Sequence, residues 1–152
     1  MRGTTVDGPG FRTSIYLAGC NHCCPGCHNP SSWEFNSGTP MSLEEIMEVV
    51  KEEDFDVTLS GGDPLCSPES TKELIEALKA DNRNVWVFTG YTWEQITASP
   101  LLTDTIRNAD VVVEGPFILS QKDPDLLFRG SSNQRLINIS SSLQFGTPTL
   151  YA

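Results

Sequence analysis

Four of the five cysteines in this chain of 152 residues are crowded between positions 20 and 27. Cys20, Cys24 and Cys27 have the spacing C-x3-C-x2-C, and Cys23 is an additional thiol inside it. Thiols so close in sequence cannot all reach disulfide partners, and clustered thiols in a chain without a secretion signal more often bind metal. Three thiolates on one tight loop can hold three irons of a [4Fe–4S] cluster. The spacing therefore predicts a cluster whose fourth iron is open to an outside ligand.

A zinc site is the alternative that the same loop allows. Cys20, Cys24 and Cys27 with either His22 or His28 form the donor set of a tetrahedral Cys3His centre. The chain has no second ligand pair at the distance typical of zinc fingers, which weighs against zinc. On these residues alone both metals stay open. Metal content separates them, because an iron–sulfur protein is brown and zinc has no visible absorbance.

The turn Ser60-Gly61-Gly62-Asp63-Pro64 is the second candidate site. Two glycines allow a ligand to approach the backbone closely. The exposed backbone groups can bind the amino and carboxylate groups of an amino acid, and the Asp63 carboxylate can accept a hydrogen bond from an ammonium. A turn of this kind is common, so by itself it is weak evidence for a ligand site. It becomes informative because the cysteine loop precedes it in the same chain.

Strands and helices alternate along the rest of the chain, which indicates βα units and a mainly parallel sheet. The strands lack strict alternation of apolar and polar residues, as expected for a sheet buried on both faces. We predict strands over residues 12–18, 55–59, 85–88, 109–113 and 135–139. We predict helices over residues 43–53, from Pro68 onward with Ser67 as the cap, around 93–96 and over 101–107.

Ligands of parallel sheets bind at the carboxyl ends of the strands. In this sequence the residues that could bind a ligand or take part in a reaction follow the predicted strands. The cysteine loop, Ser60 to Asp63, Thr89 to Tyr91 and Glu114 to Pro116 each follow a predicted strand. Thr89 and Tyr91 are therefore candidates for contact with a ribose or adenine, with packing as the alternative. For Arg12 we expect a place at the surface, the alternative being contact with a carboxylate or the cofactor.

Charge and composition exclude several classes of function. The chain has 20 acidic and 10 basic residues, a formal net charge of −10, which repels the phosphates of nucleic acids and anionic membranes. It has neither an apolar run of the ~20 residues needed to span a bilayer nor the apolar region of a signal peptide. We expect one domain over residues 1–152, located in the cytoplasm, without nucleic-acid or membrane partners.

The two motifs together resemble the signature of the radical S-adenosylmethionine superfamily, in which C-x3-C-x2-C is followed by a Gly-Gly-acid turn. Within it, the chain is similar to the glycyl-radical activating enzymes, and most to the branch that serves the anaerobic ribonucleoside-triphosphate reductase. At position 63 this chain has Asp where the wider superfamily often has Glu. The resemblance is carried by residues 6–12 (VDGPGFR), 19–30, 59–65 (LSGGDPL), 88–92 (FTGYT) and 128–135 (FRGSSNQR).

The resemblance implies a fold, a cofactor and the residues that bind it. The fold is α/β, an incomplete open (βα) barrel with mainly parallel strands of the radical S-adenosylmethionine type. Cys20, Cys24 and Cys27 are the implied cluster ligands. The implied contacts to S-adenosylmethionine are backbone atoms of Gly26, Cys27 and His28, and the turn Gly61, Gly62 and Asp63 at the methionine end.

The resemblance also implies an activity. An electron donor such as flavodoxin reduces the cluster, S-adenosylmethionine is cleaved to methionine and a 5′-deoxyadenosyl radical, and that radical takes a hydrogen atom from a glycine of the class III anaerobic ribonucleotide reductase. One alternative is an activase of another glycyl-radical enzyme such as pyruvate formate-lyase, which the short chain and the stretch from Arg129 to Arg135 disfavour. The alternative from another class is a zinc-binding interaction module.

Overall fold

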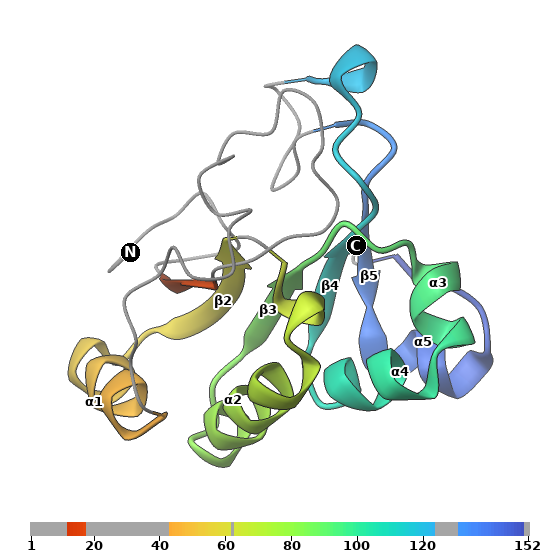
Figure 1. Cartoon of the computed structure of the whole chain (residues 1–152). Helices are drawn as coiled ribbons and strands as arrows, with labels where there is room; N and C mark the ends of the chain where they lie inside the picture. Colours follow the sequence, from red (N-terminus) through yellow and green to blue (C-terminus); the bar gives the residue numbers. More distant parts are fainter. Residues whose placement is uncertain (1–11, 18–42, 62, 124–130, 151–152) are drawn as a thin grey trace.

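The computed structural model describes residues 12–17, 43–61, 63–123 and 131–150. Its centre is a five-stranded sheet with the strand order β1-β2-β3-β4-β5 (Figure 1). The strands β1 to β4 run parallel, and β5 runs antiparallel to β4. The strands are β1 (Arg12–Leu17), β2 (Asp56–Gly61), β3 (Val85–Phe88), β4 (Val111–Glu114) and β5 (Arg135–Asn138).

Helices make the crossovers between the parallel strands, so each connection advances the sheet by one strand in the same direction. Among the described residues β1 pairs with β2, and β5 pairs with β4 and makes one isolated bridge to Leu150, so β1 and β5 are not joined and the sheet is not closed. This arrangement agrees with the predicted incomplete barrel. The helices are α1 (Leu43–Glu53), α2 (Pro68–Ala80), α3 (Trp93–Ala98), α4 (Pro100–Ile106) and α5 (Ile139–Phe145), with short 3-10 turns η2 (Pro64–Cys66) and η3 (Leu119–Gln121).

Local capping explains where two of the helices begin. Thr92 caps α3 by accepting from the Gln95 amide, and the Gln95 side chain accepts in return from the Thr92 amide, a complete capping box. Ser99 caps α4 through the Leu102 amide, and a proline follows it at the first helical position. Ser67 holds the N-cap position of α2 as predicted, but its side chain makes no capping hydrogen bond.

The predicted elements are confirmed, with shifts of one or two residues at several ends. The helix over 43–53 and the strand over 85–88 have the predicted bounds. β2 continues to Gly61, two residues beyond its prediction, and β4 begins at Val111 rather than at residue 109. The helix α5 was not predicted, because three consecutive serines interrupt its apolar spacing.

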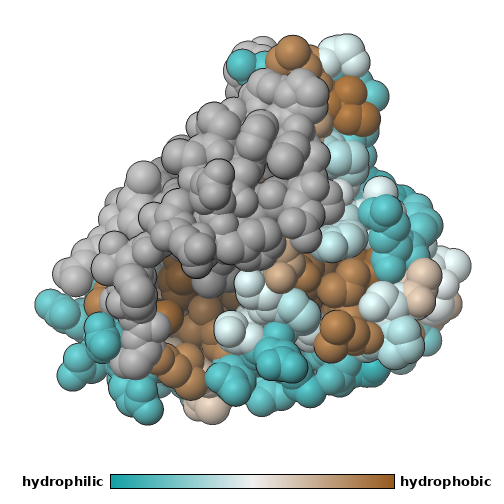
Figure 2. Space-filling model, viewed as in Figure 1, coloured by the Kyte–Doolittle hydropathy of each residue, from teal (hydrophilic) through white to brown (hydrophobic). Residues whose placement is uncertain are grey.

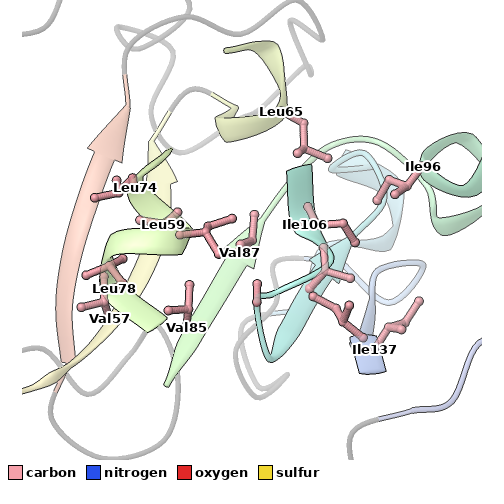
Figure 3. Close-up of a cluster of buried hydrophobic side chains, with 14 of the residues drawn as sticks. Val57, Leu59, Leu65, Leu74, Leu78, Val85, Val87, Ile96, Ile106 and Ile137 are labelled. Atoms are coloured by element: carbon pink, nitrogen blue, oxygen red, sulfur yellow. The ribbon is translucent and has the colours of Figure 1, made fainter. Parts of the chain in front are cut away.

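The main core lies between one face of the sheet and the helices (Figure 3). Figure 3 shows Val57 and Val85 of neighbouring strands directed toward Leu74 and Leu78 of α2. Each of the five helices contributes a buried side chain to this one cluster, so all of them pack toward the same face. The contributing side chains are Val50, Leu74, Ile96, Ile106 and Ile139 from α1 to α5.

The other face of the sheet is also buried, as the strand composition predicts. Trp86, Val111 and Val113 form a second cluster, with Phe88 and Leu136 packed against it. The outward surface of the helices is largely hydrophilic (Figure 2). In the part of the chain that the structure describes, none of the helices is long and apolar enough to cross a bilayer.

The expectation of a surface position for Arg12 is wrong, because its side chain is 1 % exposed. Its Nε donates to Thr58 Oγ1 at 2.9 Å, and one terminal nitrogen donates to the Val57 carbonyl at 2.9 Å. The same nitrogen reaches the Asn84 carbonyl and side-chain oxygens, and the guanidinium lies 5.5 Å from the ring centroid of Trp86. Arg12 therefore ties β1 to β2 and to the start of β3 at the amino ends of the strands, away from the predicted site.

We expect Arg12→Lys to lower the free energy of unfolding by about 2 kcal/mol, because lysine keeps the charge but loses the planar fork that reaches several acceptors. Urea unfolding followed by circular dichroism measures this loss. The exposed Arg107→Lys is the matched control and should stay within about 0.5 kcal/mol of the parent protein. Equal effects at both positions would contradict a structural role for Arg12.

Candidate functional site

The carboxyl ends of the four parallel strands meet at one edge of the sheet (Figure 1). At this edge the last residue of β1, Leu17, is paired with Gly61, the last residue of β2. The segment that carries the cysteines begins directly after Leu17, and the Gly-Gly-Asp turn continues directly from Gly61. The two motifs predicted to act together therefore leave the sheet side by side.

Several predicted site residues lie outside the residues that the structure describes. These are Cys20, Cys24, Gly26, Cys27, His28 and Gly62. The described residues of the predicted site are Gly61, which ends β2, and Asp63, which is the N-cap of η2. Cys66, the one cysteine among the described residues, is half-buried at the end of η2, and its amide donates to the Asp63 carbonyl at 3.0 Å.

Asp63 is 1 % exposed and accepts hydrogen bonds from two loops. Its Oδ1 accepts from the Leu65 amide at 2.9 Å, which caps η2. Its Oδ2 accepts from the Thr89 hydroxyl and from the Gly90 amide, both at 2.9 Å. The carboxylate therefore joins the turn after β2 to the turn after β3.

The loop that follows β3 continues this network to β4. Thr89 is 6 % exposed, and its hydroxyl both donates to Asp63 and accepts from the Tyr91 amide at 3.2 Å. The Tyr91 carbonyl accepts from the Gly115 amide at 2.9 Å, just beyond the end of β4. For Thr89 the packing alternative agrees with the structure. Hydrogen bonds thus link the turns after β2, β3 and β4 at one edge (rim) of the sheet, where we predicted that these turns would meet.

An ion pair between a buried carboxylate and a partly exposed guanidinium lies where β4 ends. Glu114 is 1 % exposed, and its Oε1 accepts from Arg135 Nε at 2.8 Å. The second carboxylate oxygen accepts from the Trp93 amide at the start of α3. Arg135 also binds the exposed carboxylate of Glu94 through both oxygens. The hydrogen bond to Glu114, more than any other contact, raises the pKa of Arg135 above its ordinary value.

The segment just before β5 is fixed to the same rim by side-chain amides. Gln134 Nε2 donates to the Gly115 carbonyl at 2.9 Å, and Asn133 Nδ2 donates to the Pro116 carbonyl at 2.8 Å. Gly115 has φ +101°, a backbone conformation that a side chain would strain. Because Asn133 and Arg135 are both held by neighbours within the chain, their first role is to fix this segment.

The donor chemistry of the chain fits an iron–sulfur cluster. Thiolates are the ordinary ligands of such clusters. Cys20, Cys24 and Cys27 belong to the segment that begins where β1 ends, next to Gly61.

Comparison with known proteins first defines the class. The sequence pattern of the 4Fe-4S single cluster domain matches residues 6–137, so the chain belongs to this iron–sulfur family. The donor set allows a [4Fe–4S] cluster, and the family match supports this cluster over the zinc module.

Relatives of known activity then narrow the class. The chain is 36% identical over 140 residues to the anaerobic ribonucleoside-triphosphate reductase-activating protein of Escherichia coli K12, covering 85% of this chain and 89% of the relative. Proteins with the same name from Pasteurella multocida and bacteriophage T4 are 34% and 33% identical, over 85% and 86% of this chain and 88% and 86% of their own lengths. This chain belongs to the family of anaerobic ribonucleoside-triphosphate reductase-activating proteins.

Sequence reasoning placed Glu114 in a rim loop but did not predict its partners. An acid that directly ends the run Val111 to Val113 is the available signal, because a carboxylate so close to a buried strand needs donors nearby. The donors themselves, the Trp93 amide and Arg135, are each 21 residues away in sequence.

Proposed function

We propose that this protein is a radical S-adenosylmethionine activase of the class III anaerobic ribonucleotide reductase. The single observation that supports this most strongly is the pairing of Leu17 with Gly61, because the cysteine segment follows Leu17 in the sequence and Gly61 is the first residue of the Gly-Gly-Asp motif. Family membership supplies the cluster and the kind of partner. The finer claim, that the cluster acts on S-adenosylmethionine, comes from the two motifs together.

Each motif has a distinct task in this proposal. Cys20, Cys24 and Cys27 would hold the cluster through three irons as thiolates, and the remaining iron would be open to S-adenosylmethionine. Gly26, Cys27 and His28 would contact the cofactor through backbone atoms, and Gly61, Gly62 and Asp63 would bind its methionine end. The protein thus supplies position and exclusion of water for chemistry that belongs to the cofactors.

The chemistry that the bound cofactors supply is transfer of one electron to the sulfonium, with release of methionine and of 5′-deoxyadenosine that has gained a hydrogen atom from a glycine of the partner. The sheet must leave an entrance for a glycine loop of another protein, and its open edge supports such access. An external donor such as flavodoxin delivers the electron. We place the reaction in the cytoplasm, where a reductase for nucleotides works.

The test is anaerobic reconstitution of the protein with iron and sulfide, followed by S-adenosylmethionine and dithionite and by chromatography of the products. We expect methionine and 5′-deoxyadenosine in equal amounts, formed only when cluster and reductant are both present. A brown protein that forms neither product under these conditions would contradict the proposed reaction. Zinc uptake in place of a cluster would instead restore the interaction-module alternative.

A further inference from the structure

The Asp63 carboxylate is already occupied by groups of the protein itself. From the described residues alone it receives at least three hydrogen bonds, two from the loop after β3 and one from η2, all at 2.9 Å. A carboxylate offers about four acceptor positions on its two oxygens, so at most about one is left for a further donor. The side chain is also 1 % exposed, which leaves little room for an ammonium to approach it.

The three bonds have a geometric consequence. Leu65 lies two residues after Asp63, and Thr89 and Gly90 lie on the neighbouring strand's turn. By binding both, the carboxylate fixes where the chain turns after Gly61 and how far this turn stands from the next one. Charge-assisted hydrogen bonds of this kind are about twice as strong as neutral ones, so the connection is a stiff one.

We propose that Asp63 is a positioning residue, whose carboxylate braces the turn after β2 against the turn after β3 and does not itself bind the ammonium of S-adenosylmethionine. The observed hydrogen bonds alone support the connection between the two turns. Only the expected effect on S-adenosylmethionine binding rests on the proposed function. Asp63 therefore acts on the ligand through the backbone that it holds, and Thr89 is its necessary partner.

The length of the side chain fits this role. One methylene group separates the Asp63 carboxylate from its backbone, which brings Oδ1 to the amide two residues onward, as in other Asx turns. A glutamate would place its carboxylate farther from the Leu65 amide. Asp63→Glu keeps the charge and should still loosen the brace, whereas a direct ammonium contact would tolerate the longer arm better.

The first test uses the protein without cluster or cofactor. Thr89→Val removes the hydroxyl donor and keeps the shape of the side chain, and Thr89→Ser is the matched control that keeps the hydroxyl. We expect exchange of the Leu65 and Gly90 amides with deuterated water to be about tenfold faster or more in Thr89→Val and nearly unchanged in Thr89→Ser. Unchanged exchange in Thr89→Val would overturn the brace.

The second test measures equilibrium binding of S-adenosylmethionine to the reconstituted protein for Asp63→Asn, Thr89→Val and the double variant. A positioning role predicts that both single variants weaken binding by about tenfold and that the double variant is little worse than either, because both remove one shared brace. Normal binding by Thr89→Val with a loss of a hundredfold or more in Asp63→Asn would overturn the proposal in favour of a direct contact. If the wild type does not bind S-adenosylmethionine at all, the proposed function fails, and the exchange test decides the brace by itself.

Discussion

We expect Cys24→Ala to lose essentially all formation of 5′-deoxyadenosine, while Cys23→Ala keeps most of it. Three thiolates at the spacing of Cys20, Cys24 and Cys27 hold three irons, and removal of one leaves too few ligands for a stable cluster. Adjacent residues of a loop direct their side chains differently, so Cys23 does not replace its neighbour. Iron and acid-labile sulfide analysis, together with the chromatographic assay, measures both effects.

The pair is well matched because the two positions are adjacent and the substitution is the same. Cys20→Ala and Cys27→Ala should behave as Cys24→Ala does. The ligand assignment would be wrong if Cys23→Ala abolished the cluster and Cys24→Ala did not. Loss of the cluster in both would add Cys23 to the ligand set and would remove the open iron on which the proposed reaction depends.

The second large effect concerns stability. We expect Arg135→Met to lower the free energy of unfolding by about 3–5 kcal/mol, because it leaves the Glu114 carboxylate buried without its cation. In a chain of this size a loss of that order lowers the midpoint of thermal unfolding by about 10 °C. Methionine retains much of the length of the arginine stem, so the effect reports mainly on the charge.

Glu94→Gln is the control, because Glu94 binds the same guanidinium but its side chain is 67% exposed against 2% for Glu114. Exposed ion pairs contribute about 0–1 kcal/mol, so this variant should unfold within a few degrees of the parent protein. Thermal unfolding of the two variants at neutral pH makes the comparison. Equal destabilisation would show that the contribution of the Arg135–Glu114 pair to the free energy of unfolding does not depend on the burial of Glu114.

The alternation of strands and helices was predictable because it depends on local signals. Apolar spacing over Leu43–Glu53 and the run Val85–Phe88 define one helix and one strand without knowledge of their neighbours. The meeting of the strand-ending loops at one rim follows from the parallel sheet. The direction of β5 was not predicted, since the long connection after β4 contains only the 3-10 turn η3 among its described residues, and nothing in its sequence sets the direction.

The internal connections of the site could not be predicted in the same way. Arg12 is buried because acceptors from Val57, Thr58 and Asn84 meet around it, and these lie 45 residues or more away in sequence. From the sequence we predicted that Asp63 binds an ammonium. In the structure its Oδ2 instead accepts hydrogen bonds from the Thr89 hydroxyl and the Gly90 amide. In both cases the residue type indicates a hydrogen-bonding group, and only the packed structure supplies its partner.

The assigned reaction can be tested by electron paramagnetic resonance of a purified class III ribonucleotide reductase after anaerobic incubation with this protein, S-adenosylmethionine and a reductant. We predict a glycyl radical signal on the reductase whose splitting collapses when the reductase is labelled with α-deuterated glycine. The signal should be absent with Cys24→Ala and present with Cys23→Ala. A reductase that gains no glycyl radical, while the protein carries its cluster and forms 5′-deoxyadenosine, would contradict the assigned partner.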